Sequence, residues 1–80
     1  MPRYFFDTDD GELFVADQQG IELASLEAAK LEAQKALAEM ARDALPDGDQ
    51  RTFAAVVKDE TGRVLLRMGL TLVVEQGPGA

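Results

Sequence analysis

The fold is decided by residues 25–45, which read SLEAAKLEAQKALAEMARDAL and are followed directly by Pro46. This stretch contains no glycine or proline, and its seven alanines and four leucines give it a high intrinsic helix propensity. Ser25 is a suitable N-cap, and Pro46 disfavours helix in the residue before it. An apolar stripe recurs at spacings of three and four residues, formed by Leu26, Ala29, Ala33, Leu37, Met40 and Ala44. We therefore predict one long helix with an alanine-rich face that can pack closely on a sheet.

Two hairpins are expected to flank this helix. Asp9-Asp10-Gly11 and Asp59-Glu60-Thr61-Gly62 are turn sequences, because Asp and Gly tolerate the backbone angles of tight turns. Gly69 predicts a bulge or bend in the last strand. Four strands are expected, at residues 3–7, 12–16, 52–58 and 63–75. Residues 17–24 are expected to connect the first hairpin to the helix.

Together these elements predict an α+β fold of order ββαββ, with a four-stranded antiparallel sheet and the long helix packed on one face. We expect a single domain over residues 1–76 and a flexible tail at 77–80. With 80 residues in total, one core is only marginally sufficient for stability. Self-association is therefore a reasonable expectation for this chain.

The composition excludes several classes of site. The chain has no cysteine and no histidine, which excludes disulfides, thiolate or imidazole metal sites and the common nucleophilic triads. Its net charge is −7, which disfavours general affinity for nucleic acid. No signal peptide and no apolar run of membrane-spanning length are visible, so we expect a cytoplasmic protein with no membrane partner.

Clustered carboxylates and an N-terminal proline are the sequence features that could carry chemistry. Carboxylates cluster at Asp7, Asp9, Asp10 and Glu12, but their spacing differs from a calcium-binding loop, and we interpret them as a solvated turn. Asp47-Gly48-Asp49 receives the same interpretation. Pro2 resembles the catalytic proline of small tautomerases, but its nitrogen is blocked by Met1. We expect no catalytic residue, metal or cofactor, and no enzymatic activity.

The face of the sheet that points away from the helix is the remaining candidate. Tyr4 and Phe6 share one face of the first strand, and Phe5 lies on the other. The outer face is expected to mix apolar and basic residues: Arg3, Phe5, Ala54, Val56, Lys58, Arg63, Leu65, Arg67, Thr71 and Val73. It is either an interface or an ordinary scatter of exposed apolar side chains. The candidate interface residues are Phe5, Val56, Leu65, Arg67 and Val73.

A flank of the predicted helix is a further candidate surface. It is formed by Leu31, Ala38 and Leu45, and it either extends a dimer contact or has no role.

The sequence also resembles a known group of proteins. The motifs are Met1-Pro2-Arg3-Tyr4-Phe5-Phe6-Asp7, Asp10-Gly11-Glu12, Ser25-Leu26-Glu27-Ala28-Ala29, Leu45-Pro46-Asp47-Gly48 and Leu70-Thr71-Leu72. In combination they resemble a family of short, uncharacterised bacterial proteins classed as a domain of unknown function. The resemblance covers nearly the whole chain and implies no activity, cofactor or catalytic residue.

A second resemblance is to the antitoxins of the HicB type, which also combine a sheet, an Asp/Gly hairpin turn and a helix that opens with Ser/Thr and Glu-Ala. Their additional DNA-binding segment has no counterpart after the fourth strand, which weakens the case for DNA binding. Our first hypothesis is a non-enzymatic protein-interaction module, homodimeric, that uses the outer sheet face or an edge strand. The alternative is an antitoxin-like or regulatory module that binds a partner protein or DNA.

Overall fold

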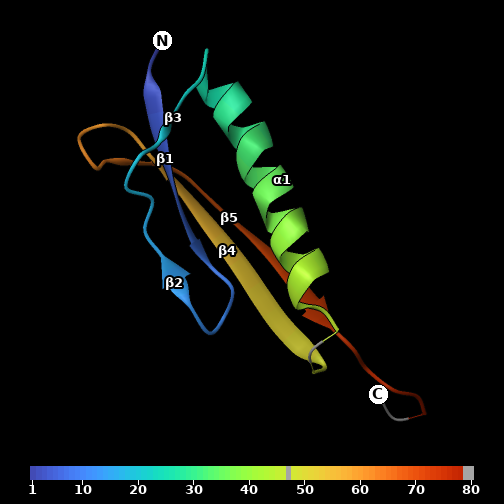
Figure 1. Cartoon of the computed structure of the whole chain (residues 1–80). Coiled ribbons are helices and arrows are strands. Elements are labelled where there is room, and N and C mark those ends of the chain that lie inside the picture. Colours follow the sequence, from blue (N-terminus) through green and yellow to red (C-terminus); the bar gives the residue numbers. More distant parts are fainter. Residues whose placement is uncertain (47, 79–80) are drawn as a thin grey trace.

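The computed structural model describes residues 1–46 and 48–78 and shows one helix lying along an antiparallel sheet (Figure 1). The elements in chain order are β1 (Arg3–Asp9), β2 (Phe14–Val15), β3 (Ile21–Glu22), α1 (Leu26–Ala44), β4 (Gln50–Lys58) and β5 (Val64–Val73). The predicted α+β class is confirmed, and so is the order of strand pairs around one helix. Asp47 of the predicted turn and residues 79–80 of the predicted tail lie outside the described residues.

Local signals at both ends of α1 act as the sequence predicts. The side-chain oxygen of Ser25 accepts a hydrogen bond from the N–H of Ala28 at 3.2 Å. At the other end, the N–H of Leu45 donates to the carbonyl of Ala41 at 2.9 Å, and the chain leaves the helix before Pro46. These bonds satisfy backbone groups that a helix terminus leaves without partners.

The sheet has the order β2-β1-β4-β5, with β3 also paired to β1. All pairs are antiparallel. The strand β2 pairs with β1 at Thr8 and Asp9, whereas β3 pairs with it at Arg3 and Tyr4. The sequence predicts only a connection at residues 17–24, so β3 is an addition to the expected topology.

The core lies between α1 and the centre of the sheet. Its buried residues are Tyr4, Ala29, Ala33, Leu37, Phe53, Ala55 and Val57. Ala29 and Ala33 have no side-chain atoms beyond Cβ, so the helix backbone can approach β4 closely and cover Phe53 completely. Leu26, the first residue of the predicted stripe and of α1, is exposed and does not belong to this core.

The second strand is shorter than the sequence predicts. It was expected at residues 12–16, but only Phe14 and Val15 pair with β1. The carboxylate of Asp10 accepts hydrogen bonds from the N–H groups of Glu12 and Leu13, at 2.9 and 2.8 Å. These donors therefore belong to the turn and are not available to the sheet.

The sequence predicts a bulge at Gly69, and the structure has it elsewhere. Gly69 pairs in regular register with Ala54. The register instead skips one residue opposite Val57 and Lys58, and the extra residue is Leu65. A glycine in a strand therefore does not by itself locate a bulge, because the position of the extra residue depends on the register with the partner strand.

This bulge changes which way the start of β5 faces. Val64 pairs with Lys58, which lies on the face away from the helix, and Val64 is exposed. Leu65 is half-buried and packs against the core, as does Leu66. The expectation that Leu65 faces away from the helix is therefore wrong, because a bulge breaks the simple alternation of side chains.

Close packing under α1 can be tested by enlarging an alanine. Ala33→Leu is expected to lower the free energy of unfolding by about 1–3 kcal/mol, because Ala33 is fully buried against the sheet and the added atoms have no space. Urea unfolding followed by circular dichroism measures the change. Ala38→Leu is the matched control, since Ala38 is exposed on the same helix and should tolerate leucine within about 0.5 kcal/mol. Equal effects of the two changes would contradict the described packing.

Candidate interaction surface

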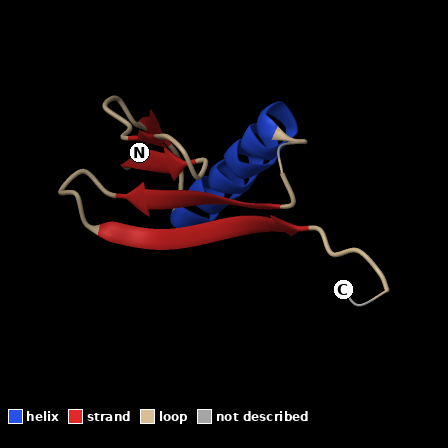
Figure 2. Cartoon of the chain, turned by 90° about the horizontal axis from the view of Figure 1, so that it is seen from below, coloured by secondary structure: helices blue, strands red, loops and turns tan. Residues whose placement is uncertain are grey.

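The most distinctive surface feature is the outer edge of β5. One side of β5 pairs with β4 along nine residue pairs. On the other side, no strand of the described chain pairs with it, and Figure 2 shows this strand, which leads to the C-terminus, at the margin of the fold. A row of backbone N–H and C=O groups is therefore open to solvent along this edge.

The register identifies the residues whose backbone groups point outward. The N–H of Val74 donates to the carbonyl of Asp49 at 2.7 Å, which makes these two residues a hydrogen-bonded pair. In an antiparallel ladder, hydrogen-bonded and non-hydrogen-bonded pairs alternate. The even-numbered residues from 66 to 72 therefore bond to β4. Arg67, Gly69, Thr71 and Val73 direct their backbone groups to the open edge.

The opposite edge of the sheet is closed by a side chain. By the same alternation, Phe6 directs its N–H away from β4, between the short strands β2 and β3. The carboxylate of Asp17 accepts this hydrogen at 3.0 Å from Oδ2, while its Oδ1 accepts the N–H groups of Gln19 and Gly20 at 3.0 and 3.1 Å. Asp17 thus completes the edge of β1 between the residues that pair with β2 and those that pair with β3.

The electrostatics of Asp17 follow from this arrangement. Partial burial disfavours its charge, but the hydrogen bonds from the backbone of Gly20, Phe6 and Gln19 outweigh that effect and hold its pKa below the usual value. The N–H of Asp17 in turn donates to Asp7 Oδ1 at 2.9 Å. Asp7 is buried, and an ion pair with Lys58 keeps its pKa low despite the burial.

A shallow groove lies beside the open edge, between α1 and β5. Its volume is about 340 Å³, and it is lined by Gln34, Leu37, Ala38, Met68, Gly69 and Leu70. Leu70 is 42% exposed on the helix side of β5, and the exposed fractions of Val73 and Val74 are 53% and 45%. The edge is therefore bordered by apolar side chains that the monomer leaves in water.

The helix flank beside this groove is also partly apolar. A larger and flatter depression of about 500 Å³ is lined by Leu23, Ala28, Leu31, Glu32, Gln34, Lys35 and Ala38. Leu31 is 54% exposed, and Ala38 lines both depressions. The predicted flank thus includes Leu31 and Ala38. Leu45 differs, because it is half-buried against the core.

The outer face of the sheet is less uniform than the sequence suggests. Of the predicted interface residues, Phe5 and Val56 are half-buried and Arg67 and Val73 are exposed, whereas Leu65 packs on the core. Val56 and Arg67 are direct cross-strand neighbours, but Val73 lies opposite Gln50 at the far end of β4.

Polar pairs interrupt that face. The ion pair of Asp7 and Lys58 lies beside Phe5 and Val56, since Phe5 pairs with Lys58 and Asp7 pairs with Val56. The hydroxyls of Thr52 and Thr71 are hydrogen-bonded across β4 and β5 at 3.1 Å. The threonine pair is exposed, as is typical of a solvated sheet surface, whereas the ion pair is largely buried on its Asp7 side.

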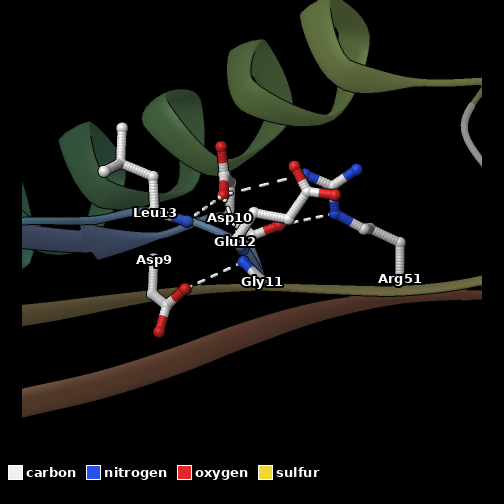
Figure 3. A network of polar contacts seen from close by, with 6 residues as sticks. All are labelled: Asp9, Asp10, Gly11, Glu12, Leu13 and Arg51. Carbon is white, nitrogen blue, oxygen red and sulfur yellow. Dashed lines mark hydrogen bonds and ion pairs between the residues drawn. The ribbon is translucent and has the colours of Figure 1, made fainter.

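Asp9, Asp10 and Glu12 lie at the predicted turn between β1 and β2 (Figure 3). Asp7 was counted with them as part of a solvated turn, and that interpretation is wrong, because Asp7 is buried in β1 and paired with Lys58. Asp9 Oδ1 accepts the N–H of Gly11 at 2.8 Å. The largely buried side chain of Arg51 donates from Nε to the carbonyl of Asp10 at 2.6 Å, and its guanidinium lies 5.3 Å from the ring centre of Phe53. These contacts attach the turn to β4. Among the described residues, no group of three or more acidic side chains has the arrangement of a metal site.

Residues 3–71 match the family described as Domain of unknown function (DUF6894). The chain belongs to this family. The match extends from β1 through most of β5, so the DUF6894 domain includes both sheet edges and the helix.

No curated protein and no solved structure matches the chain. Within the described part of the DUF6894 domain, α1 is not apolar enough to span a membrane.

The closure of the β1 edge can be tested at Asp17. Asp17→Asn is expected to lower the free energy of unfolding at pH 7 by about 1–2 kcal/mol, because an amide offers one acceptor oxygen where the carboxylate uses two. Urea unfolding at pH 7 and pH 3 measures the difference in free energy of unfolding between the wild type and the variant. Because the folded-state pKa of Asp17 is lowered, its contribution is present above about pH 4 and is lost as the pH falls through the folded value. The difference between wild type and variant should therefore shrink at pH 3.

Asp9→Asn is the control for this experiment. Asp9 is exposed, and its Oδ1 accepts a hydrogen bond from the N–H of Gly11, which an asparagine oxygen can also accept. This change should leave the free energy of unfolding within about 0.5 kcal/mol of the wild-type value. A loss at Asp9 as large as that at Asp17 would refute the role assigned to the Asp17 carboxylate.

Proposed function

We propose that this protein is a small non-enzymatic protein-interaction module that binds an extended polypeptide strand along the open edge of β5. The observation that supports this is the row of outward-pointing backbone groups at Arg67, Gly69, Thr71 and Val73, with which no strand of the described chain pairs. Addition of a strand to an exposed sheet edge is a common mode of peptide recognition, in which main-chain hydrogen bonds supply affinity.

The edge lacks the features that usually protect a free strand. Proteins discourage edge pairing with short strands, prolines, several charges or a bulge in the middle of the edge. The strand β5 is ten residues long, contains no proline and has Arg67 as its one charged residue. Its bulge lies near the start, so pairing with β4 is regular from Leu66 to Val73.

The groove beside the edge adds a place for side chains. A bound strand presents alternate side chains to the two faces of the sheet. On the helix side these would meet Met68 and Leu70, next to the groove that α1 borders. A partner strand with apolar residues at alternate positions is therefore favoured. The composition agrees with a non-enzymatic role, because the chain contains neither histidine nor cysteine.

Blocking the edge with proline tests the proposal. The N–H of Thr71 points to the open edge, so Thr71→Pro removes a donor from the edge without removing a bond to β4. Thr71→Val is the control, because it deletes the hydroxyl pair with Thr52 and keeps the N–H. Tagged wild type and both variants are recovered from the native cell, and the bound polypeptides, further copies included, are quantified.

We expect Thr71→Pro to reduce bound polypeptide at least about tenfold, which corresponds to about 1.4 kcal/mol, while Thr71→Val retains it. Circular dichroism verifies that each variant is folded, and Val73→Pro replaces Thr71→Pro if the latter does not fold. Equal recovery by wild type and a folded proline variant would contradict binding at this edge.

A further inference from the structure

We propose that the strand bound at the β5 edge is β5 of a second copy of this chain, paired antiparallel about a two-fold axis at Thr71. This inference rests on the proposed function, since it names the partner of the same edge. Two-fold dimers are the commonest soluble assemblies, and two antiparallel copies of one strand have this symmetry. The two sheets then form one continuous sheet with both helices on the same face.

The direction of the backbone groups restricts the register of such a pair. Hydrogen-bonded pairs can form only between residues whose groups point to the open edge, which are the odd-numbered residues of β5 and, by continuation, Glu75. A two-fold axis at Thr71 places Thr71 opposite itself and Gly69 opposite Val73. It also places Arg67 opposite Glu75 of the second copy.

The bulge disfavours registers in which the axis is shifted toward the start of β5. An axis at Gly69 places Val73 opposite Leu65, and an axis at Leu70 places Glu75 opposite Leu65. Leu65 is the extra residue of the bulge, where the alternation of backbone groups is broken. With the axis at Thr71, the paired segment runs from residue 67 to residue 75 and avoids the bulge.

Charge complementarity favours the same axis. Arg67 is the one charged residue of β5, and Glu75 follows two residues after its end. Both side chains are exposed, and both lie on the face away from the helix because their numbers have the same parity. The pairing brings each Arg67 opposite a Glu75, twice in the symmetric dimer, and leaves no like charges opposed.

The exposed apolar residues of this edge gather around the axis. Val73 of one copy lies opposite Gly69 of the other, which has no side chain to obstruct it. On the helix side, Val74 lies opposite Met68, at the groove beside α1. Leu70 lies opposite Leu72. Dimerisation therefore shields from water part of the apolar side chains of Leu70, Val73 and Val74, which the monomer exposes.

A charge exchange tests the register. Sedimentation equilibrium at low salt is expected to give a dimer for the wild type. Arg67→Glu or Glu75→Arg alone should raise the dimer dissociation constant about tenfold, because each creates two like-charge pairs across the axis. The double variant Arg67→Glu/Glu75→Arg should return it to near the wild-type value. Arg63→Glu is the matched control, since it makes the same charge change outside the paired segment and should have little effect.

A covalent test locates the axis. The chain has no cysteine, so Thr71→Cys introduces a unique thiol. Opposed residues of a hydrogen-bonded antiparallel pair lie about 5.5 Å apart at Cα, which is within the range a disulfide spans. Mild oxidation should convert Thr71→Cys to a covalent dimer. Thr52→Cys, one strand inward on the same face, should remain without a crosslink.

Specific results would overturn this inference. They are a strictly monomeric wild type, a dimer whose affinity is the same in both single charge variants, or efficient crosslinking of Thr52→Cys with none of Thr71→Cys. If the wild type is monomeric and Thr71→Pro still abolishes capture of other polypeptides, the second copy is the wrong partner and edge binding stands. If Thr71→Pro changes neither capture nor assembly, edge binding itself fails.

Discussion

The close contact between the alanine face of α1 and the centre of β4 is the constraint on which the rest of the structure depends. Phe53, Ala55 and Val57 of β4 are buried beneath Ala29 and Ala33. The same strand pairs with β1 on one side and β5 on the other. Because one helix supplies the whole cover, β4 is the strand buried most completely, and every other strand takes its position relative to it.

This arrangement leaves the two margins of the sheet in different states. On the β1 side, two short strands and the carboxylate of Asp17 satisfy the backbone groups that β4 does not reach. On the β5 side, no strand of the described chain pairs with the outer edge, and Leu70 is 42% exposed. A fold with one helix and one small core can close one edge well, and the other then becomes the natural place for a partner.

Much of this fold follows from local signals. The helix, its Ser25 cap, its end before Pro46 and the two Asp/Gly turns depend on residues within a few positions of one another, and all were predictable. The position of the bulge opposite Val57 and Lys58 was not predictable, because it depends on how β5 pairs with β4. The role of Asp17 was also missed, although an Asp two and three residues before Gln19 and Gly20 was a signal of a turn.

The candidate surface was only partly predictable for the same reason. Alternation correctly separated Tyr4 and Phe6 from Phe5, and it placed Arg67 and Val73 away from the helix. It failed at Leu65, where the register slips. By itself, the sequence determined the type, order and most of the extent of the main elements, because caps, turns and side-chain periodicity act over short distances. The tertiary structure alone decided which strand lies at an open edge and which backbone groups point outward. Those properties depend on pairing between segments far apart in the chain.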